Sequence, residues 1–151
     1  MSEADKKRLM VVVGAGASIE LGMPSVNEVD RLFCQWSKER FPLAHDGEGS
    51  LYSYIRDEVN RHYSLNPKNG LIKTTNFEEI LYVILQLAAV LSDDNYDLSM
   101  NAFFGLKKLP KIRSFQGEKN VDGNDVRQLN SLLVDKLTAE FRERCKFVKE
   151  N

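Results

Sequence analysis

A five-residue apolar run that stops at a glycine-rich turn constrains the fold of this chain more than any other feature. The run is Leu9 to Val13, and the turn that follows it contains Gly14 and Gly16. A strand without polar alternation is typical of the centre of a parallel sheet, where helices cover both faces. Glycines directly after such a strand let the backbone turn into a helix, whose free N–H groups favour a phosphate. The sequence therefore predicts a Rossmann-like start of an α/β fold: strand, glycine turn and helix.

The turn fills part of the dinucleotide-binding fingerprint. That fingerprint, G-x-G-x-x-G, has a third glycine that allows close packing of the helix on the strand. Ile19 stands in that place. Gly14 and Gly16 alone are therefore also compatible with a tight strand-to-helix turn in an α/β protein of another function.

A longer string around the same turn resembles the opening of the sirtuin family, G-A-G-x-S-x-x-x-G-[IM]-P. Residues Gly14 to Ser18 and Gly22 to Pro24 fill each fixed place of that pattern. The polar residue after the proline, with the amphipathic helix predicted there, is similar to the branch of NAD hydrolases that act in bacterial defence against phage. The protein deacylases of the family tend to carry an acidic-aromatic-arginine string there instead. The resemblance extends to about Leu91 and implies NAD as the cofactor.

The glycine turn is the predicted cofactor site. Backbone N–H groups, small side chains that keep the approach open, and hydroxyl donors suit a pyrophosphate. The candidate cofactor-binding residues are Gly14, Ala15, Gly16, Ala17, Ser18, Pro24, Ser25 and Asn27. For Ser18 the alternative is a helix N-cap.

One asparagine is the candidate catalytic residue. In the family, this residue lies in a Thr-Thr-Asn-aromatic-Asp string, and residues Thr74 to Glu78 resemble that string around Asn76. Glu78 replaces the aspartate, and no histidine follows His62 in this sequence. The alternative is that Asn76 caps a helix. Both histidines, His45 and His62, are expected in solvent.

The remainder of the chain predicts mostly helix. Apolar spacing between breakers predicts helices over residues 26–41, 51–62, 77–91 and 125–147. We expect the third of these to be the most buried, and a mobile loop near residues 116–124. Since Leu9 to Val13 is the one convincing strand, the sheet is predicted to be incomplete. Residues 1–151 are then a single domain, the N-terminal portion of a sirtuin-like NAD-binding domain.

An incomplete sheet would leave apolar surface without cover. The apolar stripe of the last helix consists of Val126, Leu129, Leu133, Leu137 and Phe141. Exposed apolar faces of this size usually find partners, so we expect self-association or a partner protein.

Composition excludes several classes of function. The net charge of -1 and the pI near 6.1 give no electrostatic support for nucleic-acid binding. The longest apolar segment, Ile80 to Leu91, is too short to span a bilayer, and the N-terminus is not a signal peptide, so we expect a cytoplasmic protein without membrane partners. Cys34 and Cys145 lack Cys-x-x-Cys spacing, so no metal site and no disulfide is predicted.

The resemblance implies NAD hydrolysis, with release of nicotinamide, in defence against phage when the domain is complete. The ligand would be NAD or an ADP-ribose-type nucleotide. Whether this chain is itself an enzyme stays open, because it shows no complete acid–base set. Two alternatives are a catalytically inactive module that senses a nucleotide, and a helical protein-interaction module.

Overall fold

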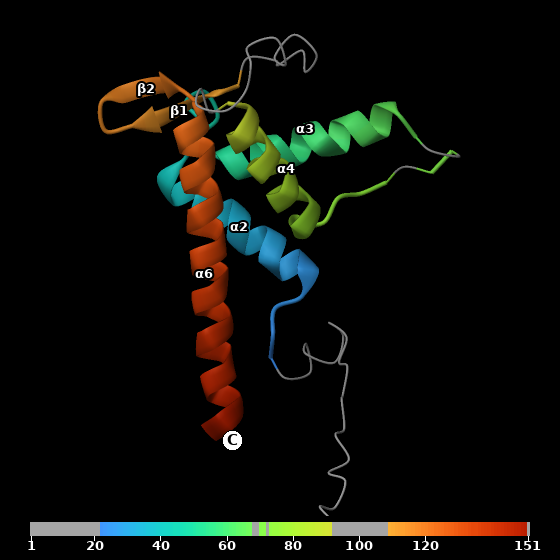
Figure 1. Cartoon of the computed structure of the whole chain (residues 1–151), viewed down its shortest axis with the longest axis vertical. Helices are drawn as coiled ribbons and strands as arrows, with labels where there is room; N and C mark the ends of the chain where they lie inside the picture. Colours follow the sequence, from blue (N-terminus) through green and yellow to red (C-terminus); the bar gives the residue numbers. More distant parts are fainter. Residues whose placement is uncertain (1–21, 68–69, 72, 92–108, 151) are drawn as a thin grey trace, which may run out of the picture.

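The computed structural model describes residues 22–67, 70–71, 73–91 and 109–150, with side chains up to Lys146. Within these ranges the chain is mostly helical with one small antiparallel sheet, a mixed α/β composition (Figure 1). The elements are α2 (Val26–Arg40), α3 (Leu51–Leu65), α4 (Phe77–Val90), β1 (Lys111–Ser114), β2 (Gly117–Asn120) and α6 (Gly123–Glu150). The expected Rossmann-like start, from Leu9 to Ser18, lies outside the described residues. No helix in the described part of the chain has the length and apolar character needed to cross a membrane.

Local caps explain where three of the helices begin. The side chain of Ser25 accepts a hydrogen bond from Glu28 N at 3.2 Å and starts α2. Ser50 and Ser53 form a reciprocal capping box that starts α3. Asn76 accepts from Glu79 N at 2.9 Å and starts α4. All of the predicted helices are confirmed, although α3 continues beyond its expected end to Leu65 and α6 extends past its expected bounds at both ends.

A β-hairpin replaces the loop expected near residues 116–124, so that expectation is wrong. β1 and β2 pair in antiparallel register from Lys111↔Asn120 to Ser114↔Gly117. Gly117 has a φ of +109°, a conformation that residues with a Cβ rarely adopt, so the glycine permits the turn. The edge of β1 that faces away from β2 is also hydrogen-bonded, since Arg113 N donates to Pro42 O at 3.0 Å.

The described helices share one hydrophobic core, in which α6 packs along α4 and α2 (Figure 1). Phe33 of α2 lies at its centre. Its ring meets the rings of Tyr52 and Phe77 edge to face, with centroids 5.4 Å and 5.7 Å away. The fully buried apolar residues around it include Val29, Leu51, Ile80, Ile84, Ile112, Val126, Leu129 and Leu133.

The structure bears on two sequence expectations about burial, and the first is wrong. Val126, Leu129 and Leu133 were expected to lack cover, but they are fully buried because α4 and α2, rather than a sheet, cover the first half of α6. The second expectation was that α4 would be the most buried helix. It is buried on one face only, and Tyr82 and Leu85 on its other face are at least half exposed.

Candidate functional site

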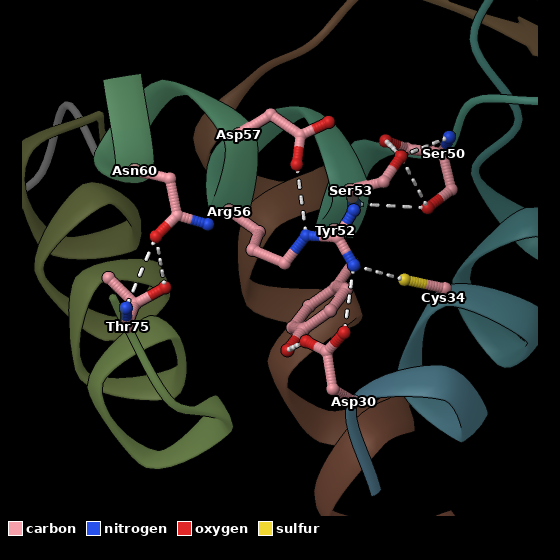
Figure 2. A network of polar contacts seen from close by, with 9 residues as sticks. All are labelled: Asp30, Cys34, Ser50, Tyr52, Ser53, Arg56, Asp57, Asn60 and Thr75. Atoms are coloured by element: carbon pink, nitrogen blue, oxygen red, sulfur yellow. Dashed lines mark hydrogen bonds and ion pairs between the residues drawn. The ribbon is translucent and has the colours of Figure 1, made fainter. Parts of the chain in front are cut away.

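A network of polar side chains joins α2 to α3 (Figure 2). Asp30 of α2 is its centre, and both oxygens of its carboxylate are engaged. Tyr52 donates its hydroxyl to Asp30 Oδ1 at 2.7 Å, and Arg56 Nη1 donates to Asp30 Oδ2 at 2.8 Å. Arg56 also contacts Cys34 Sγ at 3.1 Å and Asp57 Oδ1 at 2.9 Å. The two carboxylates, Asp30 and Asp57, thus share one guanidinium.

Burial or hydrogen bonding raises the pKa of three groups in this network. Burial raises the pKa of Tyr52, and the hydrogen bond to Asp30 raises it further, so the hydroxyl remains a donor. Burial alone would lower the pKa of Arg56, but the hydrogen bonds to Asp57 and Asp30 outweigh it, and the pKa rises. Burial also raises the pKa of Cys34 despite the nearby Arg56, so the thiol is not an activated nucleophile at neutral pH.

The predicted catalytic residue lies beside this network, at the start of α4. Asn76 uses its side-chain oxygen as the helix cap on Glu79 N. The preceding Thr75 donates both its backbone N–H and its hydroxyl to Asn60 Oδ1, at 3.1 Å and 2.9 Å. Figure 2 shows Asn60 and Arg56 on the same stretch of α3, so this helix positions the string around Asn76 and the carboxylate of Asp30. A catalytic role of Asn76 stays a prediction, and the cap is the role that its contacts account for.

Glu79, whose backbone N–H is capped by Asn76, has its carboxylate held in the ionised form. Glu79 Oε1 accepts from Lys73 Nζ at 2.7 Å and from the Tyr63 hydroxyl at 2.5 Å. The hydrogen bond from Lys73, followed by that from Tyr63, lowers the pKa of Glu79. A carboxylate in this state cannot serve as a general acid near neutral pH.

The predicted cofactor-binding residues divide into two groups. Gly14, Ala15, Gly16, Ala17 and Ser18 lie outside the described residues. Pro24, Ser25 and Asn27 lie at the start of α2, where Asn27 is exposed. Since Ser25 and the acidic Glu28 occupy the first turn, the N-terminus of α2 is unfavourable for a phosphate.

Sequence reasoning missed an arginine that fixes the end of the glycine-containing string. Arg144, near the end of α6, donates to Gly22 O at 2.8 Å, to Glu28 Oε1 at 2.6 Å and to Glu140 Oε1 at 2.8 Å. The hydrogen bond from Arg144 lowers the pKa of Glu28. The four-residue spacing of Glu140 and Arg144 was readable from the sequence. The contact with Gly22 depends on how α6 packs against α2, and local periodicity carries no signal for it.

Metal chemistry finds no support in the described part of the chain, where no three His, Cys, Asp or Glu residues come together as ligands. His45 and His62 are both exposed, which confirms the expectation that they lie in solvent. His45 Nε2 lies 4.0 Å from Glu118 Oε2, on the side of the hairpin.

Comparison of this chain with family models, curated proteins and solved structures finds no match in any of the three.

Proposed function

We propose that this chain is the NAD-binding portion of a sirtuin-like protein, and that the turn from Gly14 to Ser18 holds the pyrophosphate of NAD. The observation that carries the proposal is the filled pattern from Gly14 to Pro24. The structure also gives a physical reason for the last two fixed residues of this pattern, Gly22 and Pro24. Gly22 has a φ of +80° with no atom near the position of a Cβ, so conformation rather than space calls for glycine. Pro24 then restricts the backbone directly before the cap of α2.

The contacts of α2 support this assignment of the phosphate. Ser25 is committed to the cap, and Glu28 is paired with Arg144. An anion is therefore disfavoured at α2 and is left to the glycine turn, while Arg144 holds the Gly22 carbonyl shortly before the start of α2. In this proposal the exposed Asn27 contacts the ribose.

The proposed reaction is NAD hydrolysis with release of nicotinamide, in the cytoplasm and in defence against phage, when the domain is complete. Asn76 is its proposed catalytic residue. A second candidate function is a catalytically inactive module that senses NAD or an ADP-ribose-type nucleotide. The observation that favours the second candidate is the set of contacts at Asn76, Glu79 and Asp30, which are engaged in structural hydrogen bonds.

Calorimetric titration with NAD and with ADP-ribose tests the binding site. Gly16→Val should abolish binding because a branched side chain blocks the approach of the pyrophosphate to the backbone. Gly47→Val is the matched control, since Gly47 lies in an exposed loop with no atom near its Cβ position. A folded Gly16→Val variant with unchanged affinity would refute the proposed site.

A nicotinamide-release assay on the longest natural form of the chain separates the enzyme from the sensor. Asn76→Asp keeps the N-cap of α4 but removes the amide, so the two roles of Asn76 can be told apart. Loss of activity with unchanged stability supports catalysis by Asn76. Retained activity assigns Asn76 to the cap alone.

A further inference from the structure

A hollow of about 800 Å³ lies between the end of α2, the hairpin and the start of α6. Its volume falls within the range of small-molecule sites. Arg40, Arg113 and Phe115 line it, together with the acidic residues Glu39 and Asp125. None of these residues belongs to the proposed NAD site.

The acidic residues of this hollow are paired with lysines, whereas its two arginines have no acidic partner among the described residues. Asp125 Oδ1 lies 2.6 Å from Lys119 Nζ, and Glu39 Oε2 lies 2.8 Å from Lys136 Nζ. Arg40 and Arg113 take part in no ion pair with any residue that the structure describes. Two guanidinium charges therefore remain without a counter-charge in the described surroundings of the hollow.

Neutral partners hold both guanidinium groups in place without cancelling their charge. Arg40 Nη2 donates to Gln128 Oε1 at 3.1 Å. Arg113 donates through Nε and Nη2 to Ala44 O, at 3.3 Å and 3.2 Å. The Nη1 group of each arginine makes no hydrogen bond within the described residues and can donate to a ligand. A guanidinium group that is already held in place loses little entropy when it binds an oxyanion.

The arrangement favours phosphate over carboxylate. One guanidinium fork satisfies both oxygens of a carboxylate, whereas a phosphate has further oxygens for a second fork. The two arginines come from different elements that are joined by the hydrogen bond from Arg113 N to Pro42 O. Phe115, at the tip of the hairpin, is fully exposed and offers its ring to a flat group on the same ligand.

We propose that this hollow binds a small phosphate-bearing ligand with a flat ring, of the nucleoside-monophosphate class. Arg40 and Arg113 contact the phosphate, and Phe115 stacks on the ring. The hollow lies away from Gly22, the first described residue of the glycine-containing string. Gln128 and Arg144 are separated by about 24 Å along α6, at 1.5 Å per residue, and Arg144 donates to Gly22 O.

The test is a titration of the full 151-residue chain with AMP, followed by NMR at the Nε–H groups of Arg40 and Arg113 and at the Gly117 amide. Saturable shifts at all three positions are expected, weakened by added salt. Inorganic phosphate should cause the shifts at the arginines with lower affinity, and adenosine alone should cause none. Shifts that do not saturate, or that adenosine reproduces, would overturn the proposal.

Variants of the arginines test the phosphate contacts. Arg40→Gln and Arg113→Gln should each weaken AMP binding about tenfold, the usual effect of one lost hydrogen bond to a charged group. Arg113→Lys keeps the charge but not the fork, so its loss should be smaller. Arg142→Gln, with the same charge change in the last turns of α6, should leave the affinity unchanged. Equal affinities of the parent chain and a folded Arg113→Gln variant would overturn the proposal.

Two further variants separate the ring contact and the glycine turn. Phe115→Ala should reduce the affinity for AMP to that for inorganic phosphate, and an unchanged AMP affinity contradicts the ring contact. Gly16→Val should leave the shifts at the hollow unchanged even where NAD binding is lost. Loss of those shifts in Gly16→Val would place AMP at the glycine turn and refute the second site.

Discussion

The hydrogen bond between Tyr52 and Asp30 gives a stability prediction that a double-mutant cycle can test. Asp30→Ala removes the acceptor of a hydroxyl on a fully buried tyrosine, and leaving such a group unsatisfied costs about 1 to 3 kcal/mol. It also removes the ion pair with Arg56, which contributes at most about 1 kcal/mol, because the two side chains are 27% and 30% exposed. We therefore expect Asp30→Ala to lower the free energy of unfolding by about 3 kcal/mol.

The partner variant has a smaller expected effect. Tyr52→Phe removes one hydrogen bond to a charged group, worth about 2 kcal/mol, and leaves Asp30 paired with Arg56. In the double variant no buried hydroxyl is left unsatisfied, so it should be no less stable than Asp30→Ala alone. The coupling energy between Asp30 and Tyr52 is then about 2 kcal/mol.

Urea unfolding followed by the fluorescence of the single tryptophan, Trp36, measures these energies. Asp57→Ala is the matched control. It removes another carboxylate bound to Arg56, but Asp57 is 66% exposed, so the expected loss is below about 1 kcal/mol. Additive effects of Asp30→Ala and Tyr52→Phe, or equal losses in Asp30→Ala and Asp57→Ala, would refute the reasoning.

Three further predictions concern pH, the hairpin and association. The pKa of Tyr52 is raised on folding, so the contribution of Tyr52 to stability is complete below the unfolded pKa of about 10 and falls above it by about 1.4 kcal/mol per pH unit. The free energy of unfolding of Tyr52→Phe should therefore fall less steeply with rising alkaline pH than that of the parent chain, and identical slopes would contradict this. Gly117→Ala should destabilise the chain by about 1 to 2 kcal/mol because of the positive φ, with Gly47→Ala as the neutral control, and equal thermal midpoints of the two would refute it. Phe141 is partly exposed, so the predicted self-association should weaken in Phe141→Ser, as judged by sedimentation at low micromolar concentration; a monomeric parent chain would exclude the association itself.

The helices were predictable because their signals are local. Ser25 and Asn76 cap helices within three residues of their own position, and the apolar spacing of each helix follows from its own sequence. The hairpin was not predictable in the same way. Its strands are polar and short, and Ile112 is the one buried residue among them. The positive φ of +109° at Gly117 is marked in the sequence only by the glycine itself.

The candidate sites divide along the same line. Asn76 was identified from a short string, and its role as a cap was one of the two interpretations that the string allowed. The contact of Asp30 with Tyr52 and Arg56, and that of Arg40 and Arg113 with one hollow, join segments that become neighbours only when α2, α3 and the hairpin pack. Periodicity records which face of a helix is apolar, but it does not record which polar side chains meet across two helices.

The contact between Arg144 and Gly22 has a consequence for the order of folding. The two residues are 122 positions apart, and closing a loop of that length is entropically costly before other contacts have formed. Other contacts between α2 and α6, such as that of Lys136 with Glu39, span a similar number of residues, so we expect the Gly22 carbonyl to meet its arginine when the two helices dock. Ordering of the segment that enters α2 would then report that α6 has docked along its full length.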